Sequence, residues 1–255
     1  MRGALPRAIV AIGLVGLIAC ASAFALRAEI GTTVVSATAT LLPRKLPAHQ
    51  NAPVSLSSVT RIGTTDGSPP PGLTSIVFEF DKHGTIETKG VPVCTRAKLA
   101  ETTPQEARTR CAGALVGEGT GRAEVNLPEQ PPLEISSPLS FFNAPPVGGK
   151  PSLIAHAYET VPSPKTLLVP IVVEPIKHGR YGFQVKIEMP EIAAGYGAPT
   201  LAKATVGRIF KGGGRQVGYV NARCKGGRLQ VHGSLSFSDG DFFPATLTSP
   251  CHSPG

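Results

Sequence analysis

The chain has 255 residues, of which 41% are hydrophobic and 16% charged, and its formal net charge is +8. Its 29 glycines and 25 prolines are many for a globular protein but fewer than in typical disordered chains. This composition excludes disorder and is typical of short strands and tight turns in one large domain or two small ones. Nucleic-acid binding is not expected, because the chain lacks a dense basic stripe with interleaved aromatic residues.

The N-terminus has the pattern of a targeting segment. Two arginines precede a twelve-residue apolar run, 8–19, which is the length of a signal-peptide core. Ala21-Ser22-Ala23 and Ala23-Phe24-Ala25 both offer small residues at the positions that a signal peptidase reads. The stretch LIAC (17–20) instead resembles a bacterial lipobox, with lipidation on Cys20. An uncleaved anchor is a third alternative, because residues 8–26 carry no charge. All three alternatives place the rest of the chain outside the cytoplasm.

Cysteine usage indicates an oxidising compartment. Besides Cys20, the chain has an even number of cysteines: Cys94, Cys111, Cys224 and Cys251. Four cysteines allow three pairings, and the local pairing 94–111 with 224–251 is favoured. A zinc site is not expected, because no two cysteines have C-x-x-C spacing.

Alternating apolar residues predict antiparallel strands separated by glycine turns. The segments are 53–60, 74–80, 152–160, 165–175, 181–189, 216–224 and 228–237. Short strands with frequent turns predict an all-β fold, a mainly antiparallel two-sheet sandwich of about a dozen strands. We expect residues 1–25 to be a signal peptide and 26–255 one domain, or else two sandwiches meeting near residue 130.

One short helix interrupts this pattern. Thr103 and Glu106 form a capping-box sequence with Pro104 at the first helical position, and Gly113 is placed to end the helix. A helix of eight or nine residues is marginal alone in water. A bridge between Cys94 and Cys111 would contribute about 3 kcal/mol by the loop-entropy model. We therefore interpret these cysteines as a structural disulfide that holds the helix in place, not as reactive residues.

The same region carries a resemblance. The pattern C-x4-L…A-x3-C-x-G-A-L-V-G-x-G begins at Cys94 and ends at Gly119. It resembles uncharacterised secreted proteins of actinobacteria, and the turns at 66–68 and 238–240 are similar too. The resemblance implies a secreted β-rich fold and no known activity.

Few residues suit catalysis. The chain has no G-x-S-x-G, H-E-x-x-H or S-x-x-K motif. The candidate bases are His156, with Glu159 as its orienting carboxylate, and His232, with Asp241. Asp239 and Asp241 could hold calcium, although a hairpin turn explains this Asp-Gly-Asp sequence more simply. We expect no cofactor and no metal.

The sequence therefore predicts a non-catalytic extracytoplasmic protein that binds or supports part of the cell envelope. Without Arg2 and Arg7 the net charge is about +6, so anionic envelope polymers are candidate partners, as is another envelope protein. The basic residues look dispersed along the chain, with local clusters only at 203–215 and 223–228. Membrane contact is expected only through the leader or a lipid anchor. The alternative function is a secreted hydrolase that acts on envelope material.

Overall fold

The computed structural model describes residues 25–212 and 215–253, so the predicted signal peptide and Cys20 lie outside the described residues. Within this part, every pair of neighbouring strands is antiparallel, as predicted. The strands are β1 (Ala25–Ile30), β2 (Thr33–Leu42), β3 (Ala52–Thr64), β4 (Leu73–Asp81), β5 (Gly84–Ile86), β6 (Leu115–Val125), β7 (Leu133–Val147), β8 (Lys150–Glu159), β9 (Lys165–His178), β10 (Tyr181–Glu188), β11 (Gly197–Val206), β12 (Ile209–Gly212), β13 (Arg215–Gly218), β14 (Val220–Ala222), β15 (Arg228–Phe237) and β16 (Phe242–Pro250).

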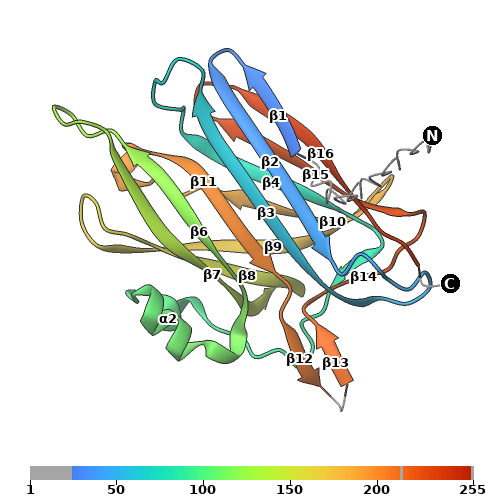
Figure 1. The fold of residues 1–255 in the computed structure, drawn as a ribbon. Coiled ribbons are helices and arrows are strands. Elements are labelled where there is room, and N and C mark those ends of the chain that lie inside the picture. Colours follow the sequence, from blue (N-terminus) through green and yellow to red (C-terminus); the bar gives the residue numbers. More distant parts are fainter. Residues whose placement is uncertain (1–24, 213–214, 254–255) are drawn as a thin grey trace, which may run out of the picture.

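The predicted two-sheet sandwich is wrong, because the strands form one nearly closed, barrel-shaped sheet (Figure 1). Twelve strands follow one another by hydrogen bonds in the order β1-β2-β3-β11-β6-β7-β8-β9-β10-β4-β15-β16. The last strand, β16, returns beside β1 and β2, and no ladder joins them in the described part of the chain. Alternation in a strand specifies that one face is buried. It does not specify whether the sheet splits into two layers or curls onto itself.

Glycines allow two strands of this sheet to approach closely. In β6, a methyl group on Gly119 would overlap the carbonyl oxygen of Lys203 in β11, and one on Gly117 would lie 2.7 Å from the oxygen of Thr205. Glycine inside a strand is typical of places where another backbone comes near. These two positions therefore require glycine for the β6–β11 pairing.

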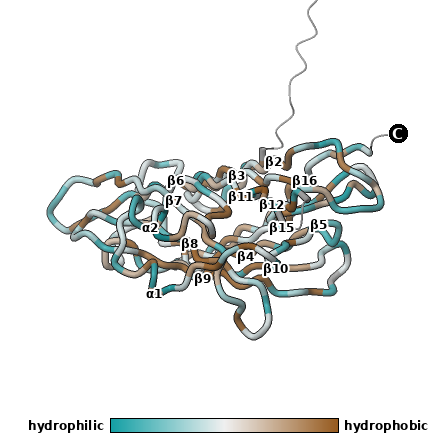
Figure 2. The backbone as a smooth tube through the Cα atoms, turned by 90° about the horizontal axis from the view of Figure 1, so that it is seen from below, coloured by the Kyte–Doolittle hydropathy of each residue, from teal (hydrophilic) through white to brown (hydrophobic). Residues whose placement is uncertain are grey.

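The inward faces of the strands bury the main core. Aliphatic side chains of β8, β9 and β10, such as Ile171 and Val185, pack with Phe78, Phe80 and Tyr219. A separate cluster joins β2 and β3 to β15 and β16. Figure 2 shows hydrophobic segments through the middle of the molecule and mostly hydrophilic loops at its two long ends. The interior is therefore filled by side chains from opposite walls of one sheet.

The helical segment lies outside the barrel, against β7 and β8 (Figure 1). It contains α1 (Arg96–Leu99), α2 (Pro104–Arg110) and the 3₁₀ turn η1 (Ala112–Ala114). The capping box is confirmed, because Thr103 and Glu106 each bond the other's backbone N–H. Gly113 does not end the helix as predicted: α2 stops at Arg110, and Gly113 lies inside η1. We call residues 94–114 the helical excursion.

The strands on both sides of residue 130 belong to the same sheet, since β6 pairs with β7. A second 3₁₀ turn, η2 (Ala193–Gly195), precedes β11. Among the described residues, no helix has the length and apolar character needed to cross a bilayer.

Candidate functional site

The predicted base His156 is fully buried between the barrel and the helical excursion. Its Nε2 lies 3.0 Å from both the carbonyl oxygen and the hydroxyl of Thr102. Burial lowers the pKa of His156, and the positive charge of Arg108 acts in the same direction. Its predicted partner Glu159 instead accepts a bond from the Ala193 amide at 3.0 Å. His156 therefore pins the excursion to β8 and is not placed to act on a ligand.

The other predicted catalytic pair is also apart. His232 in β15 faces Thr246 of β16, and its Nδ1 lies 2.9 Å from that hydroxyl. Asp241 lies in the turn beyond the end of β15, where its amide donates to Asp239 at 3.0 Å. The described residues contain no group of three acidic, histidine or cysteine side chains placed to hold a metal ion. Asp239 and Asp241 thus form a turn in this structure.

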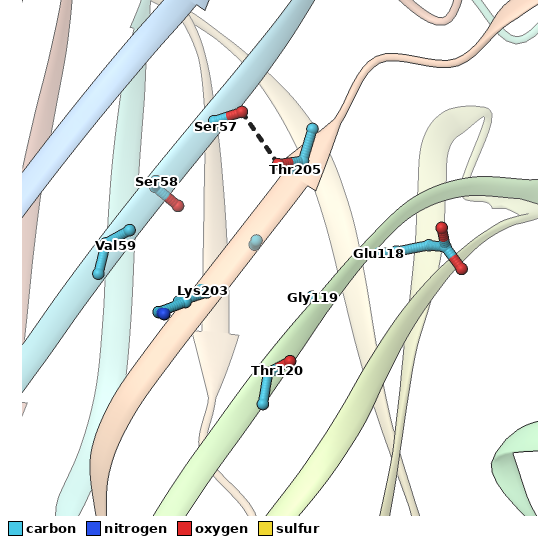
Figure 3. Close-up of a pocket in the computed structure, with 9 residues that line it drawn as sticks. Ser57, Ser58, Val59, Glu118, Gly119, Thr120, Lys203 and Thr205 are labelled. Carbon is cyan, nitrogen blue, oxygen red and sulfur yellow. Dashed lines mark hydrogen bonds between the residues drawn. The ribbon is translucent and has the colours of Figure 1, made fainter.

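A shallow polar hollow of about 460 Å³ lies on the outer face of β3, β11 and β6 (Figure 3). Ser57 and Thr205 share a hydrogen bond of 2.9 Å there. Glu118 points away from the other labelled side chains and pairs with Arg108 of α2 at 3.4 Å. The hollow has no aromatic side chain for a sugar ring to stack on.

A stronger feature lies at the end of the barrel near the C-terminus, where five segments distant in sequence meet (Figure 1). The segments are 44–52, 81–84, 177–180, 223–228 and 250–253. We call this region the basic end, and its cationic residues are Arg44, Lys45, Lys82, Lys177, Arg180, Arg223, Lys225 and Arg228. Backbone hydrogen bonds link the segments in pairs: 46 with 252, 47 with 224, 82 with 180, 83 with 223, 44 with 252 and 227 with 251. The basic end is therefore one continuous surface.

The one acidic residue in these segments is Asp81, and it is buried. Its carboxylate accepts from Arg180 Nε at 2.7 Å and from His83 Nδ1 at 2.7 Å. The backbone amides of His83 and Gln230 also donate to it, at 3.0 and 3.3 Å. Asp81 thus holds two cationic or ionisable side chains in place, and its single carboxylate offsets only one of the eight cations.

This end carries the positive excess of the molecule. The chain has 25 lysines and arginines and 17 acidic residues. Without Arg2 and Arg7, 23 of the basic residues remain. The basic end contains eight of those cations and one carboxylate, a net charge of +7. The remaining 15 cations and 16 acids leave a net charge of −1. The surface charge is therefore divided, although the sequence suggested that it was dispersed.

A small core of its own supports the basic end. Leu46, Val54 and Leu229 pack around the disulfide between Cys224 and Cys251. Five of the eight cations make no side-chain hydrogen bond or ion pair with another described residue, namely Arg44, Lys45, Lys177, Lys225 and Arg228. Lys45, Lys177, Lys225 and Arg228 are also exposed. A packed base with exposed, unpaired cations above it is an arrangement that can receive an anionic ligand.

Sequence reasoning missed this site because no single stretch contains it. The local cluster at 223–228 was visible, but its neighbours come from residues 44–45, 82 and 177–180. The 81–84 and 177–180 segments were recognisable only as turns. Their approach to 223–228 depends on β4 lying between β10 and β15.

Both local disulfides are present, Cys94–Cys111 and Cys224–Cys251, and they indicate an oxidising, extracytoplasmic environment. Comparison with known families found no family model that matches the chain. Comparison with curated proteins found no relative either. The function must therefore be argued from the molecule itself.

Proposed function

We propose that the protein is a non-catalytic, extracytoplasmic binding protein of the cell envelope that holds an anionic ligand at the basic end. The observation that carries the proposal is the division of charge, +7 at one end of the barrel and −1 over the rest of the chain beyond Arg7. A fixed cluster of one sign of charge raises the local concentration of oppositely charged partners. The disulfides support an envelope or secreted location.

Binding is favoured over catalysis by the surroundings of the histidines. His83 with Asp81 is the one histidine–carboxylate contact among the described residues. His83 and Asp81 line neither the polar hollow on β3, β11 and β6 nor the small hollow at the seam of β2 with β15 and β16. The same carboxylate also holds Arg180 and two backbone amides, which accounts for its burial structurally.

The test is co-sedimentation of the disulfide-intact chain from residue 25 onward, which includes every described strand, with isolated cell envelope. We expect binding at low ionic strength and release as salt is raised, because exposed charges are screened over about 8 Å at 0.15 M. Absence of binding at low salt would contradict the proposal. Release of soluble envelope fragments during incubation would instead support the alternative, a hydrolase.

A further inference from the structure

We infer that the ligand is a linear polymer with repeated phosphate charges that lies across the strand ends in an extended form, a conclusion that rests on the proposed function. The cations are arranged as an arc rather than as a pocket. Lys45 lies beside His252 after β16, and Arg228 pairs with Pro250 across β15 and β16. Arg180 donates to the carbonyl of Arg228 at 2.6 Å, and Lys82 donates to the carbonyl of Gly179 at 3.2 Å.

The arc extends over several strand ends. From β16 to β10 it crosses three strand spacings, which is roughly 15 Å at about 4.8 Å per spacing. Arg223 extends the surface toward Asn51, whose side-chain oxygen lies 3.4 Å from a guanidinium nitrogen of Arg223. A chain with repeated negative charges would contact successive cations along this path.

The arrangement of the cations along an arc argues for a polymer rather than a small anion. One hollow of the described residues lies on β3, β11 and β6, away from this end. Another, at the seam of β2 with β15 and β16, reaches Leu229 below the basic end, but it holds only about 20 Å³ and its lining is largely apolar. Small ligands are usually held in concave sites that bury most of their surface. An extended ligand instead gains affinity from many exposed contacts, each of them weak.

The apolar residues argue against a membrane as the ligand. Among the described large apolar side chains that are exposed, only Leu42 is within two residues of a cation of the basic end. Stable attachment to a bilayer usually needs an inserted apolar anchor in addition to a basic patch. One leucine beside eight cations favours a soluble polymer.

The test compares two triple variants with the same loss of charge. Lys45→Ala/Lys225→Ala/Arg228→Gln, which we call the arc variant, removes three exposed cations of the basic end. Lys98→Ala/Lys203→Ala/Arg61→Gln removes three exposed cations elsewhere, one of which lines the polar hollow. None of the six makes an ion pair with another described residue. Their matched thermal unfolding would show that both variants fold.

Binding to poly(glycerol phosphate) is measured at low salt, with neutral dextran and phosphatidylglycerol vesicles as the other ligands. We expect the arc variant to bind poly(glycerol phosphate) about tenfold more weakly than the parent chain, and the control less than about twofold, because each exposed ion pair contributes up to about 1 kcal/mol. Equal losses in both variants would overturn the inference. So would tighter binding to vesicles than to the polymer.

These outcomes separate the inference from the function on which it rests. A chain that binds isolated envelope but not poly(glycerol phosphate) would disprove the polymer and leave the proposed function standing. A chain that binds neither would remove both.

Discussion

The helical excursion and the basic end have a similar construction, but the residues of the first are close in sequence and those of the second are far apart. Each has a small buried core around one disulfide, Cys94–Cys111 in the excursion and Cys224–Cys251 in the basic end. The excursion is mostly one run of 21 residues, whereas the basic end joins five segments from residue 44 to residue 253. The first is therefore readable from sequence, and the second exists only in the folded barrel.

Removing each disulfide in turn tests most strongly whether the two regions differ in function. Cys224→Ser/Cys251→Ser should lower the free energy of unfolding by about 3 to 4 kcal/mol by the loop-entropy model, and it should also abolish envelope binding. This bridge ties the 223–228 turn to the end of β16, so its loss releases cations of the arc. Denaturant unfolding and co-sedimentation measure the two effects.

Removing the other bridge is the control. Cys94→Ser/Cys111→Ser should lower the free energy of unfolding by about 3 kcal/mol, because the loop that this bridge closes is only somewhat shorter. Envelope binding should remain intact. Loss of binding in this variant would mean that the excursion, rather than the basic end, holds the ligand.

Asp81→Asn tests the centre of the basic end. The change leaves Arg180 without its charged partner in a buried setting and should cost about 2 to 4 kcal/mol, at the lower end because Arg180 is 30% exposed. The matched change in the excursion is Glu106→Gln, which removes the charge from an exposed capping box and should lower the free energy of unfolding far less than Asp81→Asn does. Similar costs in chemical denaturation would show that Asp81 has no organising role.

His156→Gln tests how the excursion is held to the barrel. We expect the free energy of unfolding to fall by about 1 to 2 kcal/mol at neutral pH, because the substitution disturbs a buried hydrogen bond to Thr102. Because burial lowers the pKa of His156 in the folded state, acid should destabilise the parent chain. Below about pH 6.5 the unfolded chain takes up a proton that the folded chain excludes.

In the variant, the fall in unfolding free energy between pH 7 and pH 5 should be shallower than in the parent. An unchanged slope would mean that His156 titrates normally in the folded protein.

The smallest expected effect is that of Tyr219→Phe in the main core. Tyr219 is fully buried, burial raises the pKa of its phenol, and its hydroxyl has no hydrogen-bond partner among the described residues. Removing an unpaired buried hydroxyl should change stability by less than about 1 kcal/mol, with a gain expected. A large loss on thermal unfolding would show that the hydroxyl has a role in the core.

The local patterns predicted much of the secondary structure. β15 was predicted with its observed bounds, 228–237, and the capping box of α2 was predicted residue by residue. The strands β6 and β7 were not predicted, because glycines interrupt the alternation of one and prolines that of the other. In both, tertiary hydrogen bonding to neighbouring strands overrides local propensity.

The candidate site could not be predicted in the same way. Asp81 and His83 are two residues apart in a turn, a spacing that suggests only a local bond. Arg180 reaches Asp81 because β10 and β4 are neighbours, and Arg228 joins them because β15 pairs with the other side of β4. The sequence named His156 and His232 instead, since strand positions alone made them look accessible.

What the sequence determined by itself was local: antiparallel strands, glycine turns, a capped helix and two short-range disulfides. These depend on residues close in the chain, where alternation and capping act directly. Only the tertiary structure decided that the sheet curls into a barrel and that eight cations meet at one end. Both depend on strand order, and strand order is set by the packing of side chains far apart in sequence.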